Sequence, residues 1–183
     1  MKLFVALDLP ESVDMQLSWL GGGIHGARWE PAEKLHLTLR YLGEVDGGER
    51  KQVEAALERV DFESFPLAIR GVGHFPPRGQ PRSVWAGVDD ASQLDRLHHR
   101  IGHALDAIGI DGDRRKFAPH VTLARLRHSP EQEVAEFLAR HALLSTPPWT
   151  VDAFALYSST RGPRGSKYAI ERVYPLLRAA DGV

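Results

Sequence analysis

The sequence predicts an α+β fold in which two similar lobes of mostly antiparallel sheet carry helices on the outside. Short runs rich in Leu, Val, Phe and Tyr alternate irregularly with segments of helical periodicity, which favours largely antiparallel sheets over one regular parallel wind. A His-x-Thr motif occurs once in each half of the chain, 84 residues apart. We therefore expect a single bilobal domain spanning 1–183.

Seven segments have the length and composition of short strands. They are residues 3–9, 35–42, 66–72, 84–88, 120–126, 151–158 and 168–175. Four segments between them have helical patterns, residues 11–20, 48–60, 92–108 and 130–144. In the third of these, apolar residues recur three or four positions apart and form one stripe. Turn formers and cations predict two loops, at 74–83 and 159–167.

Composition narrows the classes of function and location. The 23 basic and 24 acidic side chains nearly balance, which argues against a uniformly cationic surface that coats duplex nucleic acid. The absence of cysteine excludes disulfides and thiolate nucleophiles, and it fits a reducing compartment. The first apolar run ends at Asp8, too early for a signal peptide or a membrane span. We expect a cytoplasmic protein without membrane contact.

The doubled motif, HLTL at 36–39 and HVTL at 120–123, is the strongest functional signal. Alternation along a strand places His36 and Thr38 on one face and their leucine neighbours on the other. The same holds for His120 and Thr122. If the two lobes face each other, two imidazoles and two hydroxyls converge in one cleft. The alternative is structural, because threonine suits strands and histidine can be a satisfied core residue.

Two imidazoles and two hydroxyls, without an evident carboxylate or metal cluster, suit acid–base phosphoryl chemistry. Histidine changes charge near neutral pH, so one imidazole can accept a proton while the other donates one. Opening a cyclic phosphodiester needs both, because the attacking water loses a proton and the departing ribose oxygen gains one. Each threonine hydroxyl can donate to a non-bridging phosphate oxygen.

The two tetrads resemble those of the 2H phosphoesterase superfamily. The wider pattern LFVALDLP, LHLTLRYLG, SVWAGV, FAPHVTLARL and FALYSS is similar to its RNA 2',3'-cyclic phosphodiesterases, also called 2'-5' RNA ligases, over nearly the whole chain. The resemblance implies pseudo-twofold lobes with a catalytic cleft between the sheets. It also implies opening of a terminal 2',3'-cyclic phosphate to a 2'-phosphate without a metal or other cofactor. By position, His36 would be the proton donor and His120 the acceptor, with Thr38 and Thr122 holding phosphate.

Three further side chains are candidates for the site. Arg125 matches a family arginine, and a cation near phosphate is chemically favourable. Strict alternation nevertheless turns Arg125 away from His120 unless the strand ends or bulges there. Arg40 has the parity of the first motif, so it either lines the cleft or forms a surface ion pair. Tyr41 is a possible platform for a nucleobase. The resemblance is weaker at Ala118, where many relatives have an arginine.

The partners expected from these features are RNA ends or small nucleotide cyclic phosphates, bound by a monomer. Cations around the cleft would attract these ligands. The candidates are Arg78, Arg82, Arg114, Arg115, Lys116, Arg161, Arg164 and Lys167. Phe75 and Tyr168 are further possible stacking platforms.

Two other functions compete with hydrolysis of a cyclic phosphate, and a metal site is a further alternative. The same histidines could join RNA through a 2'-5' bond if a 5'-hydroxyl replaced the attacking water. A non-catalytic module could bind RNA ends, although arginine or backbone amides would suffice for that purpose. A metal site is suggested by Asp95, His99 and His103, four positions apart on a predicted helix, but an exposed helix face accounts better for this spacing.

Overall fold

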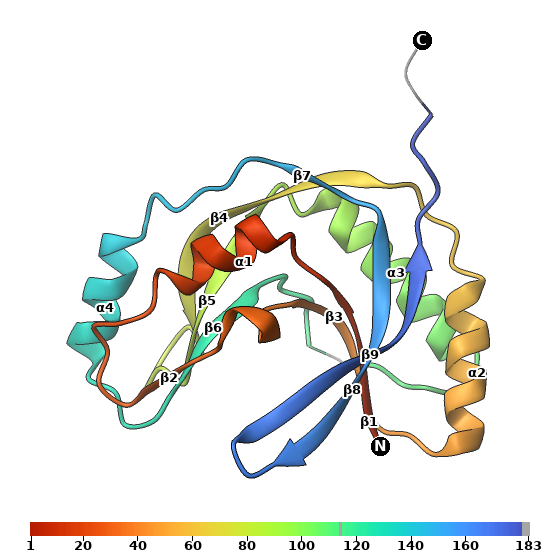
Figure 1. The fold of residues 1–183 in the computed structure, drawn as a ribbon, viewed down its shortest axis with the longest axis horizontal. Helices are drawn as coiled ribbons and strands as arrows, with labels where there is room; N and C mark the ends of the chain where they lie inside the picture. Colours follow the sequence, from red (N-terminus) through yellow and green to blue (C-terminus); the bar gives the residue numbers. More distant parts are fainter. Residues whose placement is uncertain (114, 181–183) are drawn as a thin grey trace.

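The computed structural model describes residues 1–113 and 115–180, which form one strongly curved, nine-stranded sheet with helices packed against it (Figure 1). The strands are β1 (Lys2–Leu7), β2 (Ala27–Trp29), β3 (Leu37–Glu44), β4 (Phe65–Phe75), β5 (Ser83–Asp89), β6 (Val121–Leu126), β7 (Trp149–Val151), β8 (Ala153–Gly162) and β9 (Gly165–Pro175). The helices are α1 (Glu11–Ser18), the short 3-10 helix η1 (Ala32–Lys34), α2 (Gly47–Glu58), α3 (Ser92–Asp106) and α4 (Glu131–Arg140). The predicted α+β class is confirmed.

The sheet has two halves joined by a single pair of strands. Its order is β7-β4-β5-β6-β3-β1-β8-β9, with β2 paired to β6, and the named pairs are antiparallel. β3 and β6 meet through the pair Leu37 and Val121 alone. Each predicted lobe is therefore half of a continuous sheet, and the two His-x-Thr segments lie at the seam between the halves.

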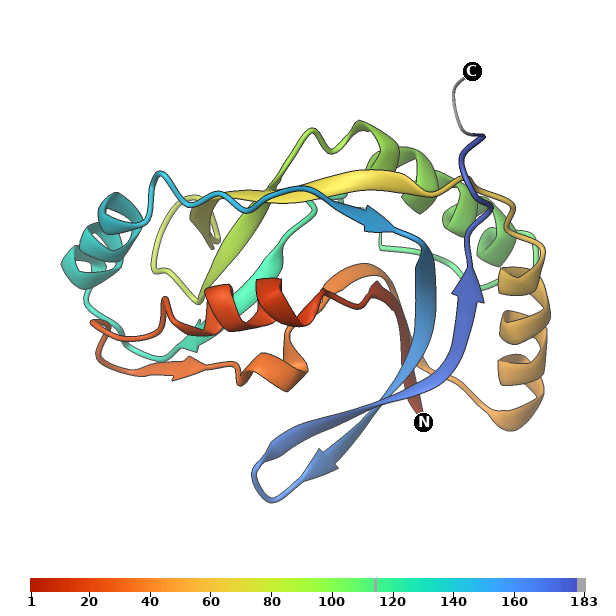
Figure 2. The same cartoon turned by 45° about the horizontal axis from the view of Figure 1, so that its top comes forward.

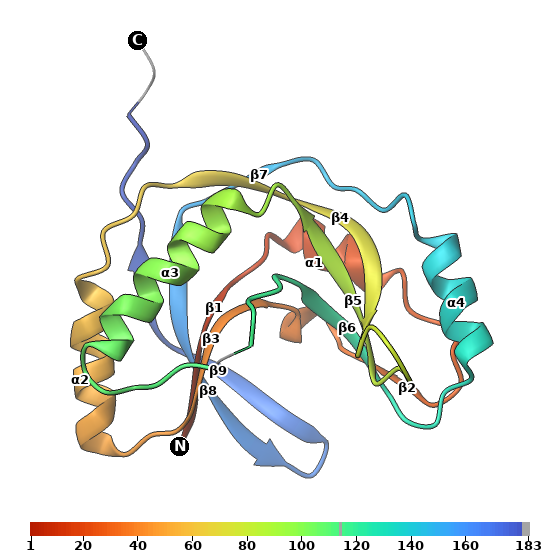
Figure 3. The same ribbon diagram turned by 180° about the vertical axis from the view of Figure 1, so that it is seen from behind.

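The main core lies on the face of the sheet that carries the helices. Alternate residues of β1, such as Leu3 and Val5, are fully buried in it together with the predicted stripe of α3. Phe4 and Ala6 point to the opposite face and form a small cluster with Ala155 and Tyr157. Figure 3 shows α2 and α3 against one half of the sheet and α4 at the far end of the other. The face of β1 that carries Phe4 and Ala6 is therefore available to line the site.

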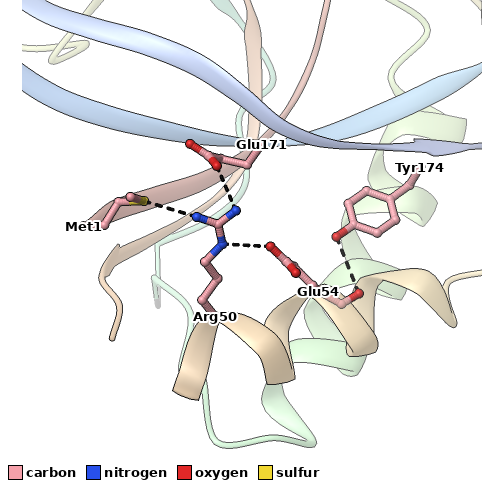
Figure 4. Close-up of polar contacts among 5 residues, drawn as sticks. All are labelled: Met1, Arg50, Glu54, Glu171 and Tyr174. Carbon is pink, nitrogen blue, oxygen red and sulfur yellow. Dashed lines mark hydrogen bonds and ion pairs between the residues drawn. The ribbon is translucent and has the colours of Figure 1, made fainter. Parts of the chain in front are cut away.

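Polar contacts attach α2 to the end of the sheet, as Figure 4 shows. Arg50 donates to Glu54 within α2 and to Glu171 of β9, at 2.8 Å in each case. The Asp46 side chain accepts from two backbone amides in a capping box that begins the helix. These contacts fix α2 beside the start of β1. No helix in the described part of the chain has the length and apolar character needed to cross a bilayer.

The predicted loop at 159–167 is wrong, because it is the outer part of a β-hairpin. β8 and β9 stay paired to the turn, where Gly162 faces Gly165, and the hairpin projects from the sheet (Figures 1 and 2). Gly165 has a φ of 101°, which a residue with a Cβ rarely adopts, so the turn formers mark only the tip. β2 and β7, of three residues each, were not predicted.

Candidate active site

The two His-x-Thr motifs lie side by side across the seam of the sheet. Leu37 pairs with Val121 in antiparallel register, and both side chains are fully buried in the main core. In such a register, the residue before Leu37 lies opposite the residue after Val121. His36 therefore faces Thr122, and Thr38 faces His120 by the same rule. The pair relates the two motifs by a local twofold axis and puts all four polar side chains on the face away from the core.

A β-bulge follows Thr122 and turns Arg125 toward the site. β5 residues Trp85 and Val84 are consecutive, yet they pair with Thr122 and Ala124, so Leu123 is an extra residue in β6. The alternation is reversed beyond this point, and Leu123 and Ala124 are both buried. Arg125 consequently lines the same cavity as His36 and Thr38. Its Nε lies 3.8 Å from Glu30 Oε1.

An equivalent bulge follows Thr38 and removes Arg40 from the site. Val5 and Ala6 of β1 pair with Arg40 and Thr38, so Leu39 is the extra residue in β3. Of the two alternatives for Arg40, lining the cleft is wrong, and the structure shows an ion pair instead. Its guanidinium donates to Asp106 of α3 at 2.6 Å and to the Ile110 carbonyl at 2.9 Å, on the helix-covered face, and only 9% of the side chain is exposed. Its neighbour Tyr41 turns instead to the other face and lines the cavity.

Both imidazoles have the same hydrogen bond, which fixes their tautomers. His36 Nδ1 lies 2.7 Å from the Lys34 carbonyl, and His120 Nδ1 lies 2.7 Å from the Ala118 carbonyl. A carbonyl oxygen only accepts, so each Nδ1 carries a proton and donates it. This arrangement leaves the two Nε2 atoms for proton exchange with a bound molecule, and it holds both rings in fixed orientations.

Burial lowers the pKa of both histidines, because the protonated ring loses its hydration. The charge of Arg125 lowers both pKa values further, and the nearby His120 adds to this effect at His36. The hydrogen bonds to the backbone carbonyls oppose these effects, as does the carboxylate of Glu30 at His36. The free site consequently favours the neutral form of both imidazoles, and an anion bound between them would raise both pKa values.

Each histidine is bordered by its own aromatic group. The His36 ring lies 5.0 Å from Phe4 and 5.2 Å from Tyr168, measured between ring centroids. The His120 ring lies 4.9 Å from Phe75 and 6.2 Å from Trp85. These rings exclude water from one side of each imidazole, which accounts for the burial that lowers the pKa values. Sequence reasoning missed Phe4, because every residue of its strand from Leu3 to Leu7 is apolar and no alternation marks a face.

A cavity of about 730 Å³ opens on the His36 side of the site. It is lined by Met1, Lys2, Phe4, His36, Thr38, Tyr41, Glu44, Arg125, Ser159, Thr160, Arg161, Ser166 and Tyr168. His120 and Thr122 are absent from this lining. The cavity is therefore asymmetric although the motifs are symmetric, and it offers room for a ligand next to His36 rather than His120.

The remaining sequence candidates are scattered. Of the eight predicted cations, Arg161 lines the cavity, Arg115 pairs with Asp113, and Arg114 lies outside the described residues. Asp95, His99 and His103 are exposed on α3, and no cluster of three or more potential metal ligands occurs in the described ranges. The catalytic candidates that the structure brings together are therefore the side chains of the two motifs and Arg125.

Comparison with known proteins gives a consistent assignment. The model of the 2'-5' RNA ligase superfamily matches residues 24–163. The RNA 2',3'-cyclic phosphodiesterase of Archaeoglobus fulgidus is 33% identical over 95% of this chain and 99% of its own length. That of Thermotoga maritima is also 33% identical, over 93% and 92%.

Solved structures have the same fold. TT0787 of Thermus thermophilus superposes with a TM-score of 0.79 and 29% identity, over 96% of this chain and 97% of its own. Escherichia coli LigT complexed with 3'-AMP superposes with a TM-score of 0.75 and 26% identity, over 96% and 97%. The likeness covers the sheet and helices together, so it includes both halves of the site.

Proposed function

This chain belongs to the 2'-5' RNA ligase superfamily, and from that premise we propose that it hydrolyses RNA 2',3'-cyclic phosphate ends to 2'-phosphomonoesters by two-histidine acid–base catalysis. The observation that carries the proposal is the twofold arrangement of His36 and His120, each with Nδ1 bonded to a backbone carbonyl. The relatives in Archaeoglobus fulgidus and Thermotoga maritima are both named RNA 2',3'-cyclic phosphodiesterase, which is this activity.

In the proposed reaction, His120 acts as the base and His36 as the acid. Water attacks phosphorus and transfers a proton to His120 Nε2, while the bond from phosphorus to O3' breaks and His36 Nε2 donates a proton to O3'. The products are a 2'-phosphate and a free 3'-hydroxyl. The hydroxyls of Thr38 and Thr122, with the guanidinium of Arg125, stabilise the charge on the non-bridging oxygens in the transition state.

The asymmetry of the cavity supports this division of roles. O3' belongs to the terminal ribose, so the nucleoside must lie on the side of the proton donor. The attacking water comes from the opposite side and needs little space. The cavity lies beside His36 and extends away from it over Phe4 and Tyr168. This placement agrees with the role that the family resemblance implies for His36.

The structure of LigT with 3'-AMP supports a nucleotide as the ligand of this fold. For the present chain, we propose RNA ends as the physiological substrate, with the protein acting as a monomeric cytoplasmic enzyme. Balanced net charge and the absence of cysteine are compatible with that setting.

The decisive experiment is hydrolysis of a short RNA ending in a 2',3'-cyclic phosphate, in EDTA, with identification of the phosphomonoester formed. We expect the wild type to form the 2'-phosphate and the variants His36→Ala and His120→Ala to lose about 10²–10⁴-fold in rate. His99→Ala, on the exposed face of α3, is the matched control. Retention of full activity by His36→Ala would contradict the mechanism. Adding an RNA with a 5'-hydroxyl to the same assay measures 2'-5' ligation as the alternative outcome.

A further inference from the structure

The cavity beside His36 is larger than a cyclic phosphate and its ribose require. Its volume of about 730 Å³ lies within the range of about 300–1,000 Å³ that holds drug-sized ligands in proteins. It continues along β1 and β8 to Lys2, Ser159 and Arg161, beyond the aromatic side chains that border His36. This far part of the cavity, lined by Lys2, Ser159 and Arg161, therefore differs in chemistry from the part beside His36.

The order of the strands explains this change of chemistry. On the open face of the sheet, Phe4 of β1 pairs with Tyr157 of β8, and Lys2 pairs with Ser159. Two residues further along β8, Arg161 pairs with Ser166 of β9. A ligand that leaves His36 along this face meets aromatic rings first, then hydroxyls and cations. One step along the face from Phe4 to Lys2 spans two residues, or about 7 Å.

The cations of the far part are free to bind an anion. In the described part of the chain, neither Lys2 nor Arg161 lies within ion-pair distance of a carboxylate, and both are exposed. Glu44, the carboxylate in the lining, lies 3.1 Å from the amino terminus of Met1, so a positive charge offsets it. The far part of the cavity consequently favours a negatively charged group.

Contacts at both ends fix the backbone segments that carry these cations. Arg28 of β2 donates to the carbonyl of Arg164 at 2.5 Å, which ties the tip of the β8–β9 hairpin to the other half of the sheet. Arg50 contacts both Glu171 and the sulfur of Met1, as Figure 4 shows, and so fixes the start of β1. Binding there needs little ordering of the backbone, which favours affinity.

We propose that Arg161 and Lys2 bind the phosphodiester that joins the terminal nucleotide to the one before it. The sequence of groups along the cavity, from catalytic histidine through aromatic rings to free cations, matches the phosphate, nucleoside and next phosphate of an RNA strand. This inference rests on the proposed function and specifies its substrate class. The enzyme acts preferentially on oligonucleotides of at least two residues rather than on nucleoside cyclic phosphates.

The test compares three substrates, cytidine 2',3'-cyclic phosphate, the dinucleotide ApC with a 2',3'-cyclic phosphate end, and the same dinucleotide with a neutral methylphosphonate linkage. A hydrogen bond to a charged group predicts that kcat/KM of the wild type is about 10- to 100-fold higher for the charged dinucleotide than for either other substrate. In Arg161→Gln, kcat/KM for the charged dinucleotide falls toward the value for the neutral dinucleotide. Arg59→Gln, an exposed arginine at the end of α2, is the control and retains the preference.

The outcomes separate the two proposals. Equal kcat/KM for charged and neutral dinucleotides, or an unchanged preference in Arg161→Gln, would overturn the inference while leaving the phosphodiesterase function standing. If the wild type hydrolyses none of the three, the proposed function fails. Calorimetric binding of the dinucleotide 2'-phosphate then decides the inference alone: weaker binding by Arg161→Gln supports the cation site, and equal binding overturns it.

Discussion

Leu39 and Leu123 occupy equivalent positions, since each follows the threonine of a His-x-Thr motif and each is the extra residue of a β-bulge. Both leucines are buried in the main core. The bulges reverse the alternation at the same place in the two strands, so that Tyr41 and Arg125 take equivalent positions on the open face. The twofold relation thus extends beyond the motifs, while the different residue types at these two positions make the two sides of the site chemically different.

The burial of Arg40 predicts a structural role that can be separated from catalysis. Arg40→Met removes the hydrogen bonds to Asp106 and to the Ile110 carbonyl while keeping much of the apolar stem. We expect the free energy of unfolding to fall by about 1–3 kcal/mol, because the partly buried Ile110 carbonyl loses its charged donor while exposed Asp106 is hydrated instead. Urea denaturation measures this loss. A fall in kcat comparable with that of His36→Ala would instead place Arg40 in the catalytic machinery.

The faces of the motif strands could be predicted from sequence, but only as far as the bulges. Alternation correctly separated His36 and Thr38 from the buried leucines, because one face of each strand must enter the core. It gave Arg40 the wrong face, since a bulge depends on pairing with a neighbouring strand and LTLRYLG contains no local signal for one at Leu39. For Arg125, alternation left open whether a bulge turns the side chain. The contribution of Phe4 was hidden for a related reason, because both faces of β1 are apolar.

The two threonines should affect the rate of the chemical step more than stability. Thr38→Val and Thr122→Val keep the branched shape at half-buried positions but remove the hydroxyl donor. Loss of one donor to a transition-state oxyanion typically lowers kcat by about 10²–10³-fold, which we expect for each variant. Steady-state kinetics with the dinucleotide that ends in a 2',3'-cyclic phosphate measures the effect, and thermal unfolding serves as the control. An increase in KM with unchanged kcat would show that the hydroxyls bind the ground state and transition state equally.

Replacing the leaving oxygen by sulfur should distinguish the acid from the base. A thiol has a pKa of about 8.5, so a 3'-thio cyclic phosphate can expel its leaving group without protonation. We expect His36→Ala to be far less impaired with this substrate than with the oxygen substrate, while His120→Ala is impaired to the same degree with both. The ratio of the two rates for each variant is the measurement. Rescue of His120→Ala alone would reverse the assignment of the two roles.

The lowered pKa values of both histidines predict an acidic optimum for kcat/KM, which reports the free enzyme. Burial favours the neutral ring, so both pKa values lie below the ordinary 6.5. The form with one protonated and one neutral imidazole is most abundant between them, which gives a bell-shaped profile centred below 6.5. The profile of kcat should lie at higher pH, because a bound phosphate anion raises both values. A single sigmoid would contradict two-histidine catalysis.

Arg125 should influence the position of this bell as well as its height. Its positive charge lowers the pKa of His36 and of His120, so removing the charge raises both values. Arg125→Gln should therefore move both limbs of the kcat/KM profile to higher pH, while loss of a charged hydrogen bond to phosphate lowers the maximum by about 10- to 100-fold. Arg115→Gln, an exposed arginine paired with Asp113, is the matched control and should leave the profile in place. A lower maximum at an unchanged pH would mean that Arg125 binds substrate without affecting the histidines.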